Sequence, residues 1–194
     1  MVFSQLVVHN NRKKWLIIND GKVFENAWKK SIDKAGYFYH RLKDSAQSFG
    51  GSNNLRFSSK NPYDCLVFSG EYLYTLELKS TKGTSLSFWR EDFEDKTKSQ
   101  TFLIHKHQIQ GLSNADKFAN VISGLVINFR ETTNHTYFWH INDFLEYTNK
   151  IDKKSFNEND IINGKGLLIN QILKKVNYEY DIYNFVQDSI KRYI

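Results

Sequence analysis

One stretch of the sequence has a clear strand–turn–strand pattern: Asn61-Pro62-Tyr63-Asp64-Cys65-Leu66-Val67-Phe68-Ser69-Gly70-Glu71-Tyr72-Leu73-Tyr74-Thr75-Leu76-Glu77-Leu78-Lys79-Ser80. Two runs rich in aromatic and β-branched residues flank a short segment whose glycine favours a turn. The pattern predicts a β-hairpin over residues 64–79. Because side chains alternate between the two faces of a strand, Glu77 and Lys79 share one face of this hairpin.

The position of Asp64 depends on which residues form the loop. A loop at 70–71 places Asp64 directly opposite Glu77, and a loop at 69–70 places it opposite Thr75 and diagonal to Glu77. Either register brings Asp64 to the face of Glu77. Opposed residues have Cβ atoms about 4.5–5.5 Å apart, and like charges there destabilise a sheet. Two carboxylates this close require a proton, a cation or open water.

Two interpretations of this hairpin face remain open. It is a solvated sheet face with an unrelated Asp, Glu and Lys, or it is a metal site in which a divalent cation neutralises both carboxylates beside Lys79. Hard oxygen ligands suit Mg²⁺, with Mn²⁺ as a substitute. A longer turn would change the parity and separate Asp64 from Glu77, so the site hypothesis depends on the hairpin register.

The composition indicates a folded protein with a basic surface. The chain has 194 residues and a formal net charge of +6, and 15% of its residues are aromatic. This length supports one domain with a sizeable core. We expect a single domain over residues 1–194, in which 1–19 form an N-terminal arm or hairpin and 150–194 a C-terminal appendage. Positive charge suits an acidic partner such as nucleic acid, but a mildly basic protein without such a partner has the same charge.

Cys65 is the only cysteine of the sequence, so no intrachain disulfide and no cysteine-based zinc site can form. It lies in an apolar run and is expected in the core. The first residues lack the basic segment and long apolar run of a signal peptide, and no apolar run reaches the length of a membrane span. These features lead us to expect a cytoplasmic protein without a membrane partner.

Periodicity and turn residues predict further elements on both sides of the hairpin. Helices are expected over residues 21–35, 104–119, 142–147 and 183–192. Strands are expected over residues 55–57, 122–129 and 136–141. Asp20 and Asn142 are candidate N-caps, and Gly36 is a candidate C-cap. The polar residues 83–100 are expected to form an exposed connection.

Other motifs with recognisable chemistry are weak or absent. His105 and His107 are two residues apart, which suits neither a zinc-binding pair on a helix nor a zinc finger, so we expect structural or surface roles for them. The sequence contains no glycine-rich nucleotide-binding motif and no nucleophile-elbow motif. The hairpin face therefore remains the strongest candidate for a functional site.

Asp64, followed by Glu77-Leu78-Lys79 thirteen residues later, resembles the PD-(D/E)xK nuclease motif, although Pro62 does not directly precede the aspartate. More narrowly, the chain resembles the RecU family of Holliday junction resolvases, which is found in low-GC Gram-positive bacteria and their phages. Four ordered blocks within residues 20–145 carry this resemblance: Gly21-Lys22-Val23-Phe24-Glu25, Asp64, Glu77-Leu78-Lys79-Ser80-Thr81, and His107-Gln108-Ile109 leading to Gly124-Leu125-Val126-Ile127. A fainter similarity is found at Tyr180-Asp181-Ile182.

The resemblance implies a restriction-endonuclease-like α/β fold, in which helices flank a central mixed sheet. It also implies that Asp64, Glu77 and the Leu78 carbonyl bind Mg²⁺. Lys79 would then orient or activate the attacking water and stabilise the developing negative charge.

The same resemblance assigns roles to residues outside the hairpin. Glu25 would complete the site through a second metal or a bound water, although its ordinary role is that of an exposed acid in the first turn of a helix. Gln108 would position Lys79, a water or a nearby phosphate. Candidate contacts with DNA phosphates, each of which is otherwise a surface cation, are Arg41, Arg56, Lys60 and Lys82.

One departure from the family concerns the interval from Gly36 to Asn61, which is short and polar where cellular RecU proteins carry a stalk that enters the junction. A resolvase cuts two strands symmetrically, so a homodimer on branched DNA is expected. The expected function is that of a structure-selective Holliday junction resolvase. The alternatives are a catalytically silent DNA-binding protein with the nuclease fold and a nuclease of this fold that acts on another DNA structure.

Overall fold

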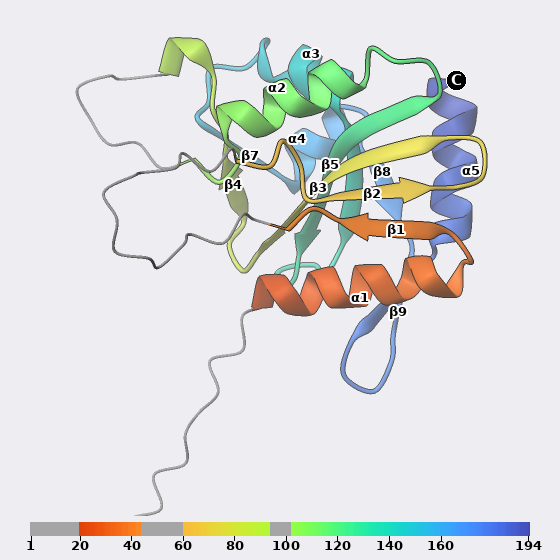
Figure 1. The fold of residues 1–194 in the computed structure, drawn as a ribbon. Coiled ribbons are helices and arrows are strands. Elements are labelled where there is room, and N and C mark those ends of the chain that lie inside the picture. Colours follow the sequence, from red (N-terminus) through yellow and green to blue (C-terminus); the bar gives the residue numbers. More distant parts are fainter. Residues whose placement is uncertain (1–19, 44–59, 94–101) are drawn as a thin grey trace, which may run out of the picture.

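A six-stranded mixed sheet forms the centre of the computed structural model, which describes residues 20–43, 60–93 and 102–194 (Figure 1). Its strands, in spatial order, are β1 (Phe38–Arg41), β2 (Cys65–Phe68), β3 (Leu73–Thr81), β5 (Val121–Phe129), β6 (Thr136–His140) and β8 (Leu167–Ile169). β3 and β5 are parallel, and the other neighbouring pairs of this sheet are antiparallel. The expected α/β fold with a central mixed sheet flanked by helices is confirmed.

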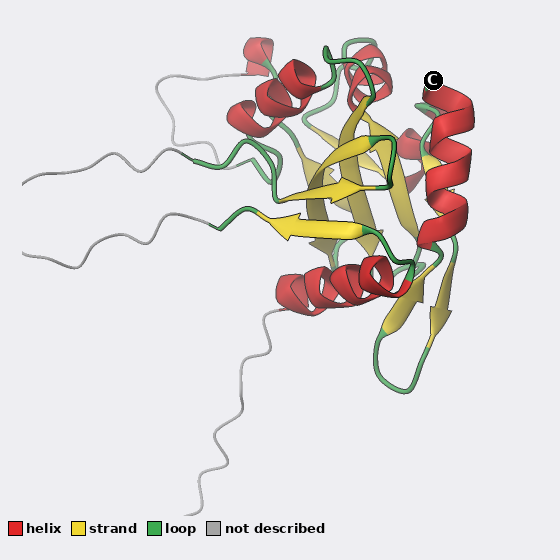
Figure 2. Ribbon diagram, turned by 45° about the vertical axis from the view of Figure 1, so that its right-hand side comes forward, coloured by secondary structure: helices red, strands yellow, loops and turns green. Residues whose placement is uncertain are grey.

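Helices cover both faces of the sheet and bury two groups of side chains (Figure 1, Figure 2). One face packs against α1 (Asp20–Lys34) and α5 (Ile182–Tyr193), and the other packs against α2 (Lys106–Ala115), α3 (Ile141–Thr148) and α4 (Glu158–Asn163). Along β3, Tyr74, Leu76 and Leu78 belong to the core beneath α1 and α5. The alternate residues Thr75 and Glu77 therefore face the α2 layer, and both are buried.

The β2–β3 hairpin adopts the first of the two expected registers. Cys65 pairs with Leu76, which places Asp64 directly opposite Glu77. The two-residue loop begins at Gly70, whose φ of +99° lies in the region that glycine tolerates without strain. The prediction that these two carboxylates share a face is confirmed, but the face is covered by protein rather than solvated.

One of the helix caps predicted from the sequence is found in the structure, and another is not. After α1, the Tyr37 N–H donates to the Ile32 carbonyl (3.3 Å) and Gly36 has a φ of +78°, so the expected glycine C-cap is confirmed. The prediction that Asn142 caps α3 is wrong. His140 is the N-cap instead, because its Nδ1 accepts a hydrogen bond from the Asn142 N–H (3.3 Å).

Residues 150–194 are an integral part of the fold, so the expected C-terminal appendage is wrong. β8 from this segment pairs with β6 in the central sheet, and Ile182 and Phe185 of α5 lie in the core beside α1. The segment also forms a hairpin of β9 (Gln171–Leu173) and β10 (Tyr178–Tyr180), which projects beyond α1 in Figure 1. A three-residue strand such as β8 is too short to give a periodic signal in the sequence.

The expected exposed connection over residues 83–100 is also wrong in part. β4 (Ser85–Ser87) pairs with β7 (Ser155–Asn157) in a separate two-stranded sheet, and a 3₁₀ turn follows at Glu91–Phe93. Leu86 and Phe88 are almost fully buried in the core of the α2 face. Because serines lie on both sides of Leu86 and separate it from Phe88, the local composition conceals this small buried strand.

Two expected features, the arm or hairpin at residues 1–19 and the strand at 55–57, lie outside the described residues. Within the part of the chain that the structure describes, no helix is long and apolar enough to cross a membrane.

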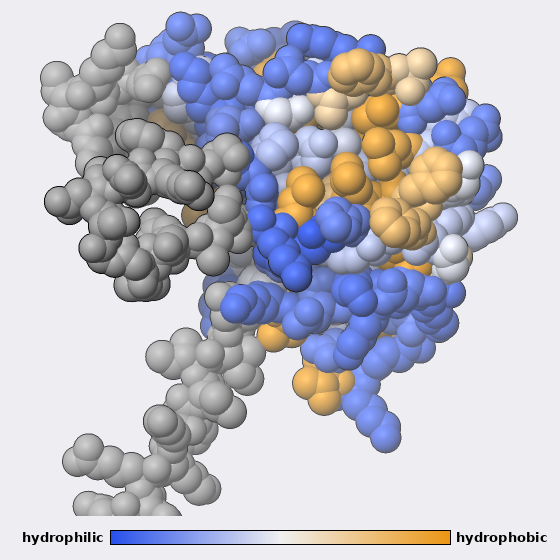
Figure 3. Space-filling model, viewed as in Figure 1, coloured by the Kyte–Doolittle hydropathy of each residue, from blue (hydrophilic) through white to orange (hydrophobic). Residues whose placement is uncertain are grey.

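The solvent-facing side of α1 is hydrophilic and basic (Figure 3). Its exposed side chains include Lys22, Lys29, Lys30 and Lys34. In the same view, hydrophobic residues gather above this helix. Two phenylalanines on neighbouring strands have exposed rings, Phe38 in β1 and Phe68 in β2.

Candidate active site

Asp64 and Glu77 form a carboxylate pair at the start of β2 and the middle of β3. The hairpin register fixes them opposite each other, and the Leu78 N–H donates a hydrogen bond to Asp64 Oδ2 (2.8 Å). Glu77 is 1% exposed, whereas Asp64 is partly exposed. The pair therefore spans the boundary between the sheet interior and solvent.

Lys79 and Gln108 hold one oxygen of the buried carboxylate. Lys79 Nζ lies 2.7 Å from Glu77 Oε1, and Gln108 Nε2 of α2 donates a hydrogen bond to the same oxygen. The other end of Gln108 is fixed as well, because its Oε1 accepts a hydrogen bond from the His105 N–H (2.8 Å). Gln108 thus joins α2 to the hairpin, and four of the expected site residues are in one place.

Burial raises the pKa of the Glu77 carboxyl to about 8, and the nearby Asp64 carboxylate adds to this rise. The Lys79 ammonium acts in the opposite direction but does not overcome the loss of solvation. The folded chain therefore holds a proton at the carboxylate pair near neutral pH unless a cation takes its place.

The donor set suits a small divalent cation. The contacts described above use Oδ2 of Asp64 and Oε1 of Glu77, and the two carboxyl groups also share a hydrogen bond, which a cation bound between them would replace. Mg²⁺ is usually held by one or two carboxylates together with waters and substrate phosphates, and it does not require a closed cage of protein ligands. In the described part of the chain, no three His, Cys, Asp or Glu side chains form a metal-binding group. The pair fits Mg²⁺ and does not resemble a structural zinc site.

Glu25 is not part of a carboxylate cluster with this pair. It forms an ion pair with Arg41 of β1. Arg41 lies opposite Cys65 in the β1–β2 ladder, and Cys65 directly follows Asp64 in the sequence. The contact joins α1 to the edge of the sheet near the site. The role of Glu25 at a second metal or a water stays a prediction.

The candidate DNA contacts are placed differently from one another. Arg41 is engaged by Glu25, and Lys82 Nζ lies 3.1 Å from Glu131 at an exposed position. Lys60 is exposed and lies close enough to α2 to affect the ionisation of its two histidines. Arg56 lies outside the described residues.

Gly111 permits close packing between α2 and the segment that leads to Asp64. A Cβ atom at position 111 would lie 2.8 Å from the Pro62 carbonyl oxygen and 3.0 Å from its Cα. Both neighbouring atoms belong to the main chain, so one of the two segments would have to move. No sequence pattern indicates this contact, because a glycine within a helix usually only weakens it.

We expect Gly111→Ala to destabilise the protein by about 1–2 kcal/mol, because overpacking costs about 1–3 kcal/mol and the better helix propensity of alanine returns about 0.5–1. Denaturant unfolding measures the change. Asn114→Ala, at an exposed position of the same helix, is the matched control and should not be destabilised. Equal stabilities for the two variants would show that α2 tolerates a side chain against Pro62.

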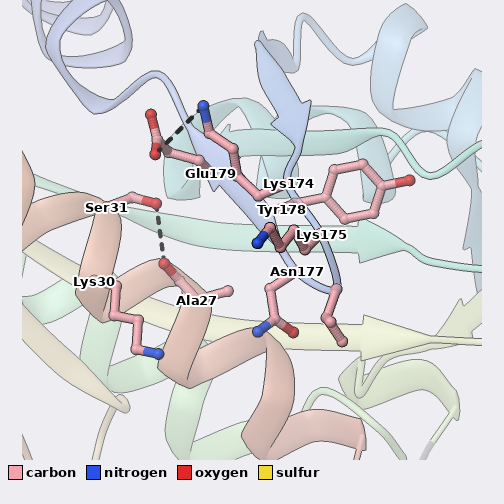
Figure 4. A pocket seen from close by; sticks show the side chains of 9 residues that line it. Ala27, Lys30, Ser31, Lys174, Lys175, Asn177, Tyr178 and Glu179 are labelled. Atoms are coloured by element: carbon pink, nitrogen blue, oxygen red, sulfur yellow. Dashed lines mark hydrogen bonds and ion pairs between the residues drawn. The ribbon is translucent and has the colours of Figure 1, made fainter.

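The site does not coincide with the cavity beside α1. This cavity has a volume of about 410 Å³, lies between α1 and the β9–β10 hairpin, and contains none of the predicted site residues (Figure 4). Lysines surround it, including Lys30, Lys174 and Lys175, and Lys174 is paired with Glu179 (3.9 Å). The carboxylate pair instead lies on the opposite face of the sheet, beneath α2.

Comparisons with known proteins show similarity to a prophage-derived protein and to a solved structure. No family model matches the sequence. Among solved structures, the fold is similar to that of Archaeoglobus fulgidus Hjc, a Holliday junction resolvase from an archaeal hyperthermophile, with a TM-score of 0.47, 14% identity, and coverage of 75% of this chain and 93% of that one. The sequence is 35% identical over 185 residues to the "SPbeta prophage-derived uncharacterized protein YotM" of Bacillus subtilis strain 168, which covers 90% of this chain and 88% of that protein. The chain therefore belongs to the same protein family as YotM.

Proposed function

We propose that this protein is a metal-dependent DNA endonuclease with a restriction-endonuclease-like fold, and that its substrate is a Holliday junction. The observation that carries the proposal is the Asp64–Glu77 pair, with Lys79 and Gln108 both on Glu77 Oε1. A buried carboxylate with a strongly raised pKa beside a lysine is costly for the fold, and such costs are typical of functional sites.

In this proposal, Asp64, Glu77 and the Leu78 carbonyl hold Mg²⁺, with Mn²⁺ as a substitute. The bound ion would polarise the scissile phosphate and lower the pKa of the attacking water. Gln108 keeps the Glu77 carboxylate in one orientation, since both of its amide atoms are hydrogen bonded. Lys79, held beside Glu77 at the partly open end of the site, orients the water and offsets negative charge that develops on the phosphate.

The substrate class is supported by charge. The net charge of +6 favours association with a polyanion, and the exposed Lys60 acts on the histidines of α2 beside the site. The relative YotM is prophage-derived, and phages are among the sources of the RecU family that the sequence resembles. The interval from Gly36 to Asn61, in which we propose a shortened stalk, lies mostly outside the described residues.

The two alternative functions, a catalytically silent DNA-binding protein and a nuclease with another substrate, can be distinguished from the proposal by experiment. A catalytically silent DNA-binding protein would have no need to keep Asp64, Glu77 and Lys79 together, so their proximity favours an enzyme. A nuclease of the same fold with another substrate would share this site and differ in DNA preference. We propose a C₂ homodimer, because paired incisions across a junction require two sites related by symmetry.

The proposal predicts paired incisions in opposite strands of a four-way junction when Mg²⁺ or Mn²⁺ is present, and none when the metal is chelated. The test compares a junction, a duplex and a flap of shared sequence at equal protein concentration, with light scattering to measure the oligomeric state on DNA. Preferential cutting of the duplex or flap would favour the other nuclease. If none of the three substrates is cleaved with either metal, the proposed endonuclease activity is refuted.

A further inference from the structure

Two histidines with stacked rings lie at the start of α2: His105 is its N-cap and His107 is in its first turn. The ring centroids of His105 and His107 are 5.5 Å apart and the planes differ by 17°. His105 is exposed and His107 is partly exposed, so neither ring is a core side chain. The pair is held in place next to the carboxylates, because the His105 N–H is bonded to Gln108, which in turn donates to Glu77.

Positive charge converges on this ring pair. Partial desolvation lowers the pKa of both imidazoles, and Lys79 and Lys60 lower the pKa of each of them further. His105 also lowers the pKa of His107. Lys106, between the two histidines, lies over the Trp89 ring at 4.4 Å. The charged groups that act on both rings are therefore two lysines from separate parts of the chain, Lys60 and Lys79.

The position of Lys60 in this group follows from the packing of its segment. Pro62 lies so close to Gly111 of α2 that no side chain fits between them, which lays the segment from 60 to 64 against the helix. This segment therefore places Lys60 near the rings and leads, four residues later, to Asp64, which the hairpin register sets opposite Glu77. The cations and the carboxylate pair are thus neighbours at the start of α2.

The lysine ammonium groups repel protons on the two imidazoles, so protonation of the rings costs free energy unless an anion binds among these groups. An anion at this place would meet the imidazole N–H groups and the Lys60 ammonium, and the positive end of the α2 dipole would add to the attraction. A phosphodiester has two unesterified oxygens, which can accept hydrogen bonds from several donors at once.

We propose that His105, His107 and Lys60 form a second phosphate-binding site for the DNA strand, next to the site at which Asp64 and Glu77 would hold the metal ion and Lys79 would face the scissile phosphate. This inference rests on the proposed function. It assigns the histidines a role in substrate binding, whereas the sequence suggested only structural or surface roles.

Binding of DNA at this second site should depend on pH. A bound phosphate favours the protonated imidazole, so binding takes up protons and the affinity for DNA increases as the pH falls from 8 to 6. The lysines that act on the rings are Lys60 and Lys79, and Lys106 lies between the two histidines in the sequence. Glu77 is the other nearby group that titrates there, so a background with Asp64→Asn and Glu77→Gln isolates the histidines.

The experiment measures DNA binding by fluorescence anisotropy in that background, with EDTA, on a labelled four-way junction at several salt concentrations. His105→Asn keeps a good N-cap residue, and His107→Gln keeps a polar side chain in the helix. We expect the double histidine variant, and separately Lys60→Ala, to raise the Kd by about tenfold and to reduce the salt slope by about one for each lost phosphate contact. The double histidine variant should also lose most of the pH dependence.

Lys191→Ala is the matched control, since it removes one exposed cation from α5 on the other face of the sheet. Thermal unfolding of each variant establishes that it is folded. A Kd, salt slope and pH dependence equal to those of the background, or losses no larger than for Lys191→Ala, would overturn the second phosphate site alone. A background protein that does not bind DNA at all would overturn this site and the proposed function together, whereas binding without cleavage in the unsubstituted protein would overturn the enzyme only.

Discussion

Asp64→Asn and Glu77→Gln should each reduce Mg²⁺-dependent DNA cleavage by about a thousandfold, because several kcal/mol of metal-supplied charge stabilisation are lost and about 1.4 kcal/mol corresponds to a factor of ten. Both substitutions keep the size and hydrogen-bonding capacity of the side chain. The Leu78 N–H can still donate to the side-chain oxygen at position 64, and Gln108 can still donate to position 77, so the fold should be retained.

The expected pattern across variants is more specific than a loss of activity. Because both carboxylates serve one metal in the proposed site, the double variant should be no less active than either single variant. Single-turnover cleavage with saturating protein measures all three, and binding to the junction in EDTA should be retained in each. Glu131→Gln, which removes an exposed carboxylate paired with Lys82, is the matched control. Full cleavage by Asp64→Asn or Glu77→Gln would refute the assignment of the site.

The hairpin shows what the sequence could predict. Alternation along β3 and a two-residue turn were sufficient to place Asp64 on the same face as Glu77, because side-chain parity is a local property, but the choice between the two registers came from the structure. The burial of Glu77 could not be predicted in this way. It depends on α2 covering the same face, and α2 begins at Lys106, far from Glu77 along the chain.

Elements with weak local patterns were missed for a related reason. β1 is a four-residue edge strand with mostly exposed side chains, and β8 has three residues, so neither shows periodicity. The hydrogen bond from Gln108 to Glu77 joins residues 31 apart, and only the resemblance to a nuclease family suggested that Gln108 belongs to the site. The ion pair between Glu25 and Arg41 is likewise a tertiary contact that no spacing predicts.

The free energy of unfolding of the metal-free protein should decrease as the pH rises from about 4.5 to about 8. The Glu77 carboxyl has its ordinary pKa of 4.5 in the unfolded chain and a pKa of about 8 in the fold. Between these values the folded state binds more protons than the unfolded state, so stability falls with rising pH. Each pH unit is worth about 1.4 kcal/mol, which gives an upper limit of about 5 kcal/mol, and the high effective dielectric of real proteins should reduce this to about 2–3.

Glu77→Gln isolates this effect, since it replaces the titrating group by a neutral one of the same shape. The variant should be more stable than the parent at pH 8 and about equally stable at pH 5, with Tm about 4–10 °C higher at pH 8. His105 and His107 oppose the trend, because their lowered pKa values make the fold lose stability as the pH falls towards 5. The difference between variant and parent cancels this contribution, and Glu131→Gln serves again as the control.

Magnesium should remove most of the difference in stability between the two proteins at pH 8. A cation that binds the ionised Asp64–Glu77 pair replaces the proton that burial otherwise favours, and at a hundred times its Kd it stabilises the fold by about 2.7 kcal/mol. The parent should therefore gain Tm with Mg²⁺ at pH 8, gain less at pH 5, where protons compete, and Glu77→Gln should gain little at either pH. If Mg²⁺ raised the Tm of the parent and of Glu77→Gln equally, the ion would be binding elsewhere, and the raised pKa of Glu77 would reflect a structural carboxyl rather than a metal ligand.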